Sequence, residues 1–296
     1  MAKYYGKYFL ALLLFGSNGV VSSRIPLNSY EIVFWRTLIG SAFLLGLLGL
    51  TRARAWRRPE GRHLLFVALS GGAMGASWIC LFEAYATVGV SVATLAYYCG
   101  PVIVMALSPL LFGERMTLAK ALGFGAVLLG MFWVNGAALA GGAAPLGLVC
   151  GALSALLYAA MVIFNKKAKS ITGLQNAALQ LLAGFLTVAV YTLARGGAAL
   201  PAQMGELAPL LFLGLVNTGL GCYLYFSAIG RLPAGTVAIC GYLEPLSALG
   251  FAALLLGEAL SPLQLAGAAL ILGGAAAGEL LGRPGRWGIK KAPGGR

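Results

Sequence analysis

The stretch CGPVIVMALSPLLFGE at residues 99–114 has a counterpart in LEPLSALGFAALLLGE at residues 243–258. Both stretches have a proline at the third position and end in Gly-Glu, and they align at a shift of 144 residues (99 to 243). The similarity extends over residues 82–130 and 226–274, where each copy contains an apolar segment, a short polar break and a second apolar segment. Self-similarity decides an architecture before other signals do. A period of half the chain is too long for a solenoid and indicates two related halves.

The composition indicates an integral membrane protein. Of 296 residues, 60% are hydrophobic and 10% are charged, whereas soluble domains carry about 25% charged and about 45–50% apolar residues. Glycine occurs 43 times, as expected for membrane helices that approach closely through small side chains. The acidic residues are eight glutamates, with no aspartate. So few carboxylates disfavour a metal site or an active site built on two carboxylates.

Several other function classes are disfavoured by what the sequence lacks. The net charge of +13 could indicate nucleic-acid binding, but the basic residues lie between apolar runs and form no stripe with aromatic residues. The five cysteines lie inside apolar runs without metal-ligand spacing, so we expect no metal and no cofactor. A membrane-embedded enzyme is a distant alternative, because the only histidine, His63, lies at a helix start and no phosphate-cradling loop occurs. A channel would need a charged ring or a carbonyl-filter motif, which the sequence lacks.

Ten apolar runs are long enough to cross a bilayer core of about 30 Å as helices. Helices are required because lipid offers no hydrogen bonds to an open backbone. We therefore predict an all-α integral membrane protein with ten transmembrane helices in two inverted five-helix repeats, at residues 1–140 and 141–282, and a basic tail at 283–296. The predicted spans are residues 8–24, 30–50, 64–87, 90–112, 117–135, 146–166, 174–194, 207–229, 234–256 and 262–281.

The distribution of lysine and arginine predicts the orientation through the positive-inside rule. With the N-terminus in the cytoplasm, the opposite side keeps only Arg24 and Arg195. The cytoplasmic segments then carry Lys3, Lys7, Arg52, Arg54, Arg57, Arg58, Arg62, Arg115, Lys120, Lys166, Lys167, Lys169, Arg231, Arg283, Arg286, Lys290, Lys291 and Arg296. We expect a multi-pass protein of the cytoplasmic membrane with both termini inside and its basic segments against anionic lipid headgroups.

Five helices in each half place the second half upside down relative to the first, because five is an odd number. Matched positions agree, since Arg115 and Lys120 of the first copy become Ala259 and Gln264 in the second, where the loop would face outward. Inverted repeats recur in secondary transporters, whose substrate site lies near the membrane midplane between the repeats and is reached by alternating access. The sequence therefore predicts a secondary transporter of a small molecule.

The residues also resemble a known family. The ten-helix layout, the duplicated half and the paired P-x12-E elements, Pro101 to Glu114 and Pro245 to Glu258, are similar to the EamA family of the drug/metabolite transporter superfamily. The element LEP at residues 243–245 resembles the family's ninth helix, and the resemblance covers nearly the whole chain. It implies transport, most often export, of a small metabolite. The family resemblance leaves the substrate open, because members move amino acids, nucleosides, amines, sugars and drugs.

Three of the charged side chains inside predicted spans stand out: Arg36, Glu83 and Glu244. A charge at membrane depth costs at least about 2.5–3.5 kcal/mol on insertion scales, so a retained charge indicates function. Arg36 and Glu83 would lie at similar depth, about 6–9 Å below the outer boundary, where they would gate the site, clasp a substrate or form a fixed ion pair. Glu244 would lie nearer the midplane, before Pro245, whose missing N–H opens the backbone. Glu83 and Glu244 are the candidates for proton coupling, although a glutamate before this proline could also be architectural.

Aromatic and amide side chains form the next set of candidates. The aromatic residues away from the interfaces where rings usually anchor a helix are Trp78, Tyr97, Tyr98, Tyr158, Tyr223, Tyr225 and Tyr242. Rings around one carboxylate would cage an amine, suit an aromatic substrate, or pack in the core. The amides inside spans are Asn18, Asn165, Gln180 and Asn217. They would bind substrate or bond across helices at about 0.6 kcal/mol each, and Asn18 lies in a weak helical stretch, GSNG at 16–19, that could bend during gating.

Two substrate classes stay open. An amino acid or related metabolite carries a carboxylate that would depend on Arg36. An organic cation, such as an amine or a choline-like compound, would use Glu83, Glu244 and the aromatic residues instead. The coupling ion, the direction and the oligomeric state are not indicated by the sequence.

Overall fold

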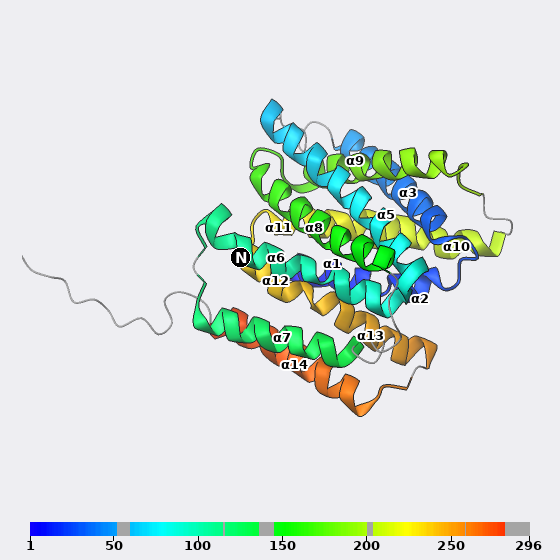
Figure 1. The fold of residues 1–296 in the computed structure, drawn as a ribbon. Coiled ribbons are helices and arrows are strands. Elements are labelled where there is room, and N and C mark those ends of the chain that lie inside the picture. The colour runs from blue at the N-terminus through cyan, green and yellow to red at the C-terminus, as the bar shows by residue number, and fades with distance from the viewer. Residues whose placement is uncertain (52–59, 115, 136–144, 200–203, 258, 282–296) are drawn as a thin grey trace, which may run out of the picture.

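The computed structural model describes residues 1–51, 60–114, 116–135, 145–199, 204–257 and 259–281. Within these residues every regular element is a helix, and most helices run side by side in one bundle (Figure 1). Several residues used for the sequence-based predictions lie outside the described residues, namely the arginines of 52–58, Arg115, Glu258 and the basic tail.

The helices follow the predicted apolar runs. Their bounds are α1 Ala2–Gly16, α2 Asn18–Ser22, α3 Ser29–Leu50, α5 Gly61–Tyr97, α6 Cys99–Phe112, α7 Leu118–Asn135, α8 Pro145–Lys167, α9 Gly173–Ala194, α10 Met204–Phe212, η2 Leu213–Leu220, α11 Gly221–Ile229, α12 Ala234–Gly241, α13 Leu243–Leu256 and α14 Pro262–Leu281. The most thoroughly buried elements are α11 and α12, so the core lies along them.

Within the described residues, seven helical segments are long and apolar enough to cross a membrane, and α6 and α7 are shorter apolar helices. Two of the seven combine consecutive elements, at residues 207–229 and 234–256. Most of the exposed large side chains are leucines, as expected for helices solvated by lipid. The all-α architecture with several membrane-spanning helices is confirmed, whereas the count of ten stays a prediction.

Helix α5 reverses direction along its length, as its contacts with α8 show. Ser77 Oγ donates a hydrogen bond of 2.9 Å to the main-chain oxygen of Ser154 in α8. A Cβ built on Gly151, less than one turn away in α8, would lie 2.7 Å from Ala96. A straight helix would separate Ser77 from Ala96 by almost 30 Å, or about 1.5 Å per residue. The two arms of α5 are therefore antiparallel, in agreement with the predicted boundary between spans near residues 87–90.

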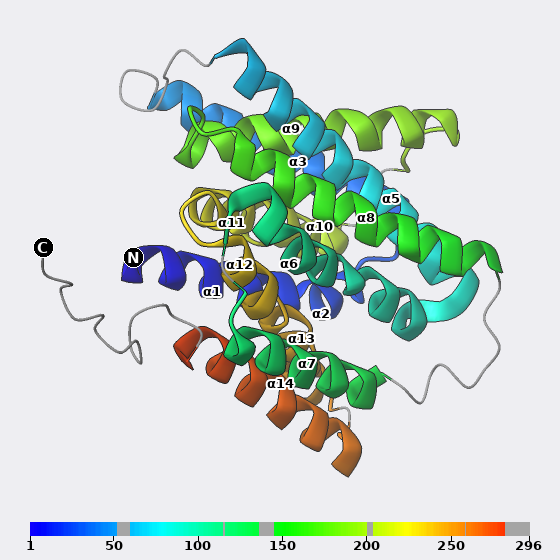
Figure 2. The same ribbon diagram turned by 60° about the vertical axis from the view of Figure 1, so that its left-hand side comes forward.

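Helices α7 and α14 lie side by side and pack through glycines (Figures 1 and 2). A Cβ built on Gly123 would lie 2.5 Å from the Gly274 oxygen, and one on Gly130 would lie 2.5 Å from the Gly267 oxygen. The two backbones thus touch, as small residues allow in membranes. The order of these contacts makes the helices antiparallel. In the sequence repeat Gly123 corresponds to Gly267 and Gly130 to Gly274. Gly123 therefore contacts the repeat equivalent of Gly130, and Gly130 contacts the repeat equivalent of Gly123.

The bundle has two chemically different ends. At one end, which we call the basic end, Tyr5 Oη donates to Glu279 at 2.5 Å, so the start of α1 and the close of α14 lie together. Lys166 lies at the same end, where its Nζ donates at 3.2 and 2.5 Å to carbonyl oxygens at and beyond the close of α11. The other end, which we call the opposite end, carries Glu83 and Arg195, joined by an ion pair of 2.7 Å.

Candidate functional site

A cavity of about 530 Å³ lies between helices from both halves of the sequence. Eight of the candidate residues named from the sequence line it, namely Asn18, Arg36, Trp78, Tyr97, Tyr98, Tyr158, Tyr225 and Glu244. Small-molecule sites in proteins measure about 300–1,000 Å³ and are mostly apolar with a few placed polar groups. The cavity has this size and this kind of lining, because its other walls include phenylalanine, methionine, leucine and alanine side chains.

Arg36 supplies the positive charge of the cavity from α3. Its side chain is 8% exposed, and its Nε donates a hydrogen bond of 3.0 Å to Thr218 Oγ1 in η2. The guanidinium carbon also lies 5.0 Å from the centre of the Trp78 ring in α5. A guanidinium has five N–H donors in a planar fork, a geometry that suits the binding of a carboxylate.

Glu244 supplies the negative charge from a break between two helices. α12 ends at Gly241 and α13 begins at Leu243, which places Glu244 in the first turn of α13. Pro245 suits this first turn because the backbone N–H groups there have no helical partner. Within the described part of the chain no donor hydrogen-bonds to the Glu244 carboxylate, and Arg36 is its cationic electrostatic partner. The carboxylate is therefore available to a cationic group in the cavity.

Tyrosine rings form one wall of the cavity. The Tyr97 ring lies 5.3 Å from the rings of Tyr98 and Tyr158, at interplanar angles of 68° and 75°. The hydroxyl groups of Tyr158 and Tyr225 are 3.3 Å apart. The near-perpendicular packing is the favourable arrangement for aromatic pairs. It presents both ring faces and hydroxyl groups to a bound molecule.

Asn18 lies at the start of α2, directly after the break that ends α1. Ser17 separates α1 from α2, which confirms the weak helix predicted at residues 16–19. The Asn18 Oδ1 accepts a hydrogen bond of 2.9 Å from Asn217 Nδ2. Asn18 therefore reaches the cavity from a helix break, as Glu244 does.

Two of the predicted amides lie outside the cavity and bond across helices. Asn165 Nδ2 donates to Asn176 Oδ1 at 3.1 Å and to Gln180 Oε1 at 3.2 Å, and Gln180 Nε2 donates to Ser70 Oγ at 2.7 Å. Asn165 and Gln180 are 3% and 0% exposed. The structure thus favours the second role that the sequence left open for them, a polar network that joins α5, α8 and α9.

Three further candidates also lie outside the cavity lining. Tyr242 is 0% exposed and donates a hydrogen bond of 2.6 Å to the main-chain oxygen of Tyr98, so it supports the aromatic wall from behind. Tyr223 faces Lys7, whose Nζ lies 3.3 Å from the hydroxyl and 4.5 Å from the ring centre. Asn217 is 0% exposed and bonds to the break after α1. None of these three side chains lines the cavity itself.

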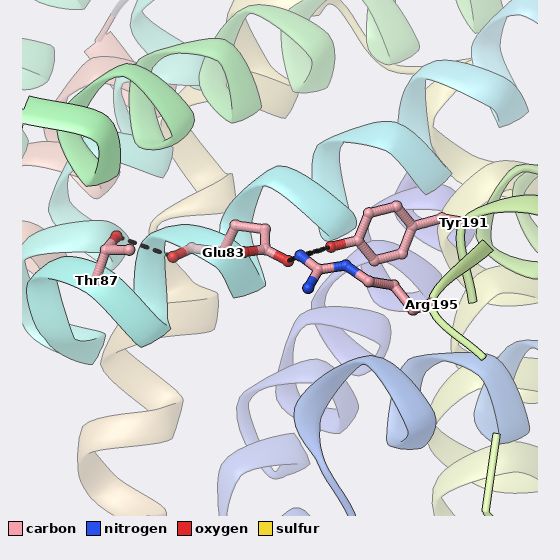
Figure 3. Close-up of polar contacts among 4 residues, drawn as sticks. All are labelled: Glu83, Thr87, Tyr191 and Arg195. Carbon is pink, nitrogen blue, oxygen red and sulfur yellow. Dashed lines mark hydrogen bonds and ion pairs between the residues drawn. The ribbon is translucent and has the colours of Figure 1, made fainter. Parts of the chain in front are cut away.

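Glu83 has a different partner from the one its depth indicated. Its carboxylate accepts hydrogen bonds from Arg195, at 2.7 Å, and from Tyr191, and Figure 3 shows both groups reaching it from α9 and its end. A fixed ion pair of Glu83 with Arg36, one of the roles that the sequence left open, is not formed among the described residues, because two side chains at equal depth can lie on different sides of a bundle. Glu83 lines a separate crevice of about 280 Å³ at the opposite end, which shares Phe82 with the cavity.

Sequence reasoning missed several residues of the site. Thr218, the partner of Arg36, lies in an apolar run and carries no charge that would single it out. Phe15 and Ser22 line the cavity one turn before and after Asn18. Their spacing of three and four residues follows one face of a helix, so extending each predicted polar position along its face would have found them.

Relatives with known names match most of the chain. An uncharacterized transporter, YxxF, of Bacillus subtilis (strain 168) is 24% identical over 246 residues, which cover 81% of this chain and 77% of that protein. A probable terminal-alkyne amino-acid exporter of Streptantibioticus cattleyicolor is 29% identical over 269 residues, which cover 88% of this chain and 83% of that protein. A crystal structure superposes with a TM-score of 0.81 at 22% identity, covering 95% of this chain and 98% of the other, and shows the same fold.

The EamA-like transporter family matches the chain twice, at residues 4–136 and 145–277. The two matches coincide with the two related halves found in the sequence, and few of the described residues lie outside the matched ranges. Together with the apolar helices, they show that the chain is a membrane protein built from two related halves. The chain belongs to the EamA-like transporter family.

Proposed function

We propose that the protein is a secondary active transporter that exports an amino acid or a closely related zwitterion across the cytoplasmic membrane. The observation that carries the proposal is one cavity whose described lining contains a single arginine, Arg36, and a single glutamate, Glu244, among aromatic walls. An α-amino acid carries a carboxylate and an ammonium group on one carbon. A site with one cationic and one anionic side chain matches both groups.

Each end of the ligand has a defined partner in this proposal. The guanidinium of Arg36 binds the carboxylate, because charge-assisted hydrogen bonds between these groups are short and strong. The Glu244 carboxylate binds the ammonium group, with the faces of neighbouring tyrosines adding cation–π attraction. The apolar lining of the cavity accepts the side chain of the amino acid. The relative described as a probable terminal-alkyne amino-acid exporter supports this substrate class.

Alternating access between two inverted repeats is the mechanism that fits this proposal. The antiparallel contacts of Gly123 with Gly274 and of Gly130 with Gly267 support it, because an axis in the membrane plane relates equivalent helices in antiparallel fashion. We place the basic end in the cytoplasm, next to anionic headgroups, on the positive-inside rule. The cavity lining reaches Ser22 near the opposite end, so this arrangement corresponds to an outward-facing state.

The contacts at the basic end are the natural cytoplasmic gate in this scheme. Glu114 accepts hydrogen bonds of 2.5 and 2.9 Å from the main-chain N–H groups of Ala234 and Gly235, at the start of α12. Glu279 bridges Tyr5 of α1 and Thr236 of α12 at 2.5 and 2.7 Å. These contacts must separate for the cavity to open toward the cytoplasm. Of the two predicted coupling groups, Glu244 is the one inside the cavity, where a proton would compete directly with the substrate ammonium group.

A second candidate function is transport of an organic cation. It is favoured by the perpendicular rings of Tyr97, Tyr98 and Tyr158, which lie in the same cavity as Glu244. A cationic ligand would bind there without a carboxylate partner. The two candidates differ in one residue, because only the zwitterion needs Arg36.

The test is a thermal-stability screen of the purified protein against amino acids and their decarboxylated amines. A ligand at 100 times its dissociation constant stabilises by about 2.7 kcal/mol. We expect amino acids to stabilise the native protein and to lose this effect in Arg36→Gln and Glu244→Gln. The exposed variants Arg231→Gln and Glu60→Gln are the matched controls and should respond as the native protein does. Undiminished stabilisation of Arg36→Gln by amino acids would overturn the zwitterion proposal.

A further inference from the structure

The eighth predicted span contains a π-helical segment, η2, between α10 and α11. Thr218 Oγ1 donates a hydrogen bond of 2.8 Å to the main-chain oxygen of Leu213, five residues earlier. The hydroxyl therefore satisfies a carbonyl inside the wide turn. π-Helical turns are rare and occur frequently at functional sites. The position of η2 beside the cavity calls for a physical account.

Two glycines bring η2 against α3. A Cβ built on Gly40 would lie 3.0 Å from Thr218 Cγ2 and 3.1 Å from the Gly214 oxygen. A Cβ on Gly214 would lie 2.6 Å from Ile39. Arg36 lies one turn before Gly40 on the same face of α3, because residues four apart are helix neighbours. The close approach at Gly40 thus puts Thr218 within hydrogen-bond distance of Arg36.

Thr218 holds the cavity arginine without entering the cavity. It is 0% exposed, and its Oγ1 accepts the 3.0 Å hydrogen bond from Arg36 Nε while donating to Leu213. Since this single hydroxyl both accepts and donates, its direction is set by the π-helical turn. The Trp78 ring, 5.0 Å from the guanidinium carbon, packs against the same group. The guanidinium is therefore contacted by both η2 and α5.

The preceding residue, Asn217, holds the other helix break. Its Nδ2 lies 3.0 Å from the Leu14 oxygen, 2.9 Å from Ser17 Oγ and 2.9 Å from Asn18 Oδ1. Asn217 is 0% exposed, and its Oδ1 has no hydrogen-bond partner within the described chain. A buried amide oxygen without a partner costs free energy and calls for an explanation in function. One explanation is that the Asn217 Oδ1 accepts a hydrogen bond when the break between α1 and α2 moves during transport.

We propose that Asn217 and Thr218 are positioning residues of the transport site and that η2 couples Arg36 to the break between α1 and α2. Thr218 orients the guanidinium for the substrate carboxylate, and Asn217 transmits the resulting position to Asn18. This inference rests on the proposed function, since it requires a substrate that carries a carboxylate. Thr218 and Asn217 contact the cavity residues Arg36 and Asn18, and we assign them no contact with the substrate.

The first test replaces Thr218 with valine, which keeps the shape and removes the hydroxyl, beside Thr218→Ser, which keeps the hydroxyl. Binding of an apolar amino acid and of its amide analogue, which lacks the carboxylate, is measured for each purified variant. We expect Thr218→Val to bind the amino acid about tenfold or more weakly, as the loss of a hydrogen bond to a charged group predicts. The amide analogue should change less than twofold, and Thr218→Ser should bind as the native protein does.

Equal weakening for the amino acid and its amide in Thr218→Val would overturn the positioning role, because general damage to the fold affects both ligands. If Thr218→Val does not fold, Thr218→Ala is measured in its place with the same expectations. The Arg36→Gln variant separates this inference from the proposed function. Retained amino-acid affinity in Thr218→Val with lost affinity in Arg36→Gln refutes the inference alone, whereas retained affinity in both refutes the proposed function.

The second test concerns Asn217. We expect Asn217→Ala to keep the amino-acid dissociation constant within twofold and to lower the maximal exchange rate in proteoliposomes at least tenfold. A role in packing alone would not separate binding from turnover in this way. An unchanged exchange rate, in protein that retains native binding, would refute the coupling through η2.

Discussion

The close contact of α7 and α14 allows a quantitative prediction for Gly123→Ala. The added Cβ would lie 2.5 Å from the Gly274 oxygen, 2.7 Å from the Gly278 nitrogen and 2.8 Å from the Gly278 Cα. All three neighbours are backbone atoms, so no side chain can rotate away. The shortest contact must lengthen by about 0.9 Å to reach the ordinary 3.4 Å. The two helices must therefore separate along the seam that also contains Gly130.

The size of the effect follows from the cost of overpacking. Inserting one methyl group into a closely packed interior costs about 1–3 kcal/mol, and a backbone that cannot yield places Gly123→Ala at about 2–3 kcal/mol. For a chain of a few hundred residues each kcal/mol lowers Tm by about 2–4 °C, so we expect a decrease of about 4–12 °C. Gly267→Ala should show a similar decrease, since its Cβ would lie 2.6 Å from the Gly130 oxygen.

The assay is thermal unfolding of the detergent-purified variants, and the control lies on the same helix. A Cβ on Gly125 meets nothing within 4 Å, so Gly125→Ala should be neutral or slightly stabilising, because alanine has the higher helix propensity. Gly273→Ala on α14 is the corresponding control, with the same open surroundings. A Tm of Gly123→Ala equal to that of Gly125→Ala would refute the backbone contact between α7 and α14.

Three further predictions concern the ends of the bundle. Glu83→Gln should lower Tm by no more than about 4 °C, because ion pairs this exposed contribute at most about 1 kcal/mol. It should lower transport at least tenfold if the Glu83–Arg195 pair gates the cavity, and native transport would exclude Glu83 from gating. Lys166→Met removes the donor to two carbonyl oxygens at and beyond the end of α11 and should destabilise the protein by about 1–3 kcal/mol in thermal unfolding. The control, Lys169→Met, changes an exposed side chain and should leave the stability unchanged. Equal stability of the two variants would contradict a stabilising role of the Lys166 hydrogen bonds. Ser22→Cys is made in a background without other cysteines. An impermeant thiol reagent should label it from outside intact cells, and substrate should protect it from labelling. Labelling only from inside would reverse the proposed orientation.

The fold was largely predictable because membrane helices are recognised in a sequence by the length and apolarity of their segments. Every predicted span coincides with helical residues, and the helix break at residues 16–19 was indicated by two glycines flanking a serine and an asparagine. The contact between Gly123 and Gly274 was not predictable, although both glycines were found as members of the repeat. Sequence identity at matched positions reports that two halves are related and leaves open how their helices meet.

The site was predicted in part, for a physical reason that separates its members. Arg36 and Glu244 were found because a charge in a membrane span is costly, and both line the cavity. The partner of Glu83 was missed because depth along a helix gives no information on the angle around the bundle. Thr218 was missed because a threonine in an apolar run costs little, and the π-helical turn that aims it leaves no mark in the hydrophobic periodicity.

The central claim is that one cavity recognises both charged groups of an amino acid, and exchange transport tests it most directly. Proteoliposomes with the native protein are loaded with labelled phenylalanine or leucine, and efflux is measured against three external compounds in turn. These are the same amino acid, its decarboxylated amine and its deaminated acid. We predict that only the complete amino acid drives exchange, since Arg36 and Glu244 must both be engaged. Exchange driven equally well by the amine would contradict the claim and establish a transporter for organic cations.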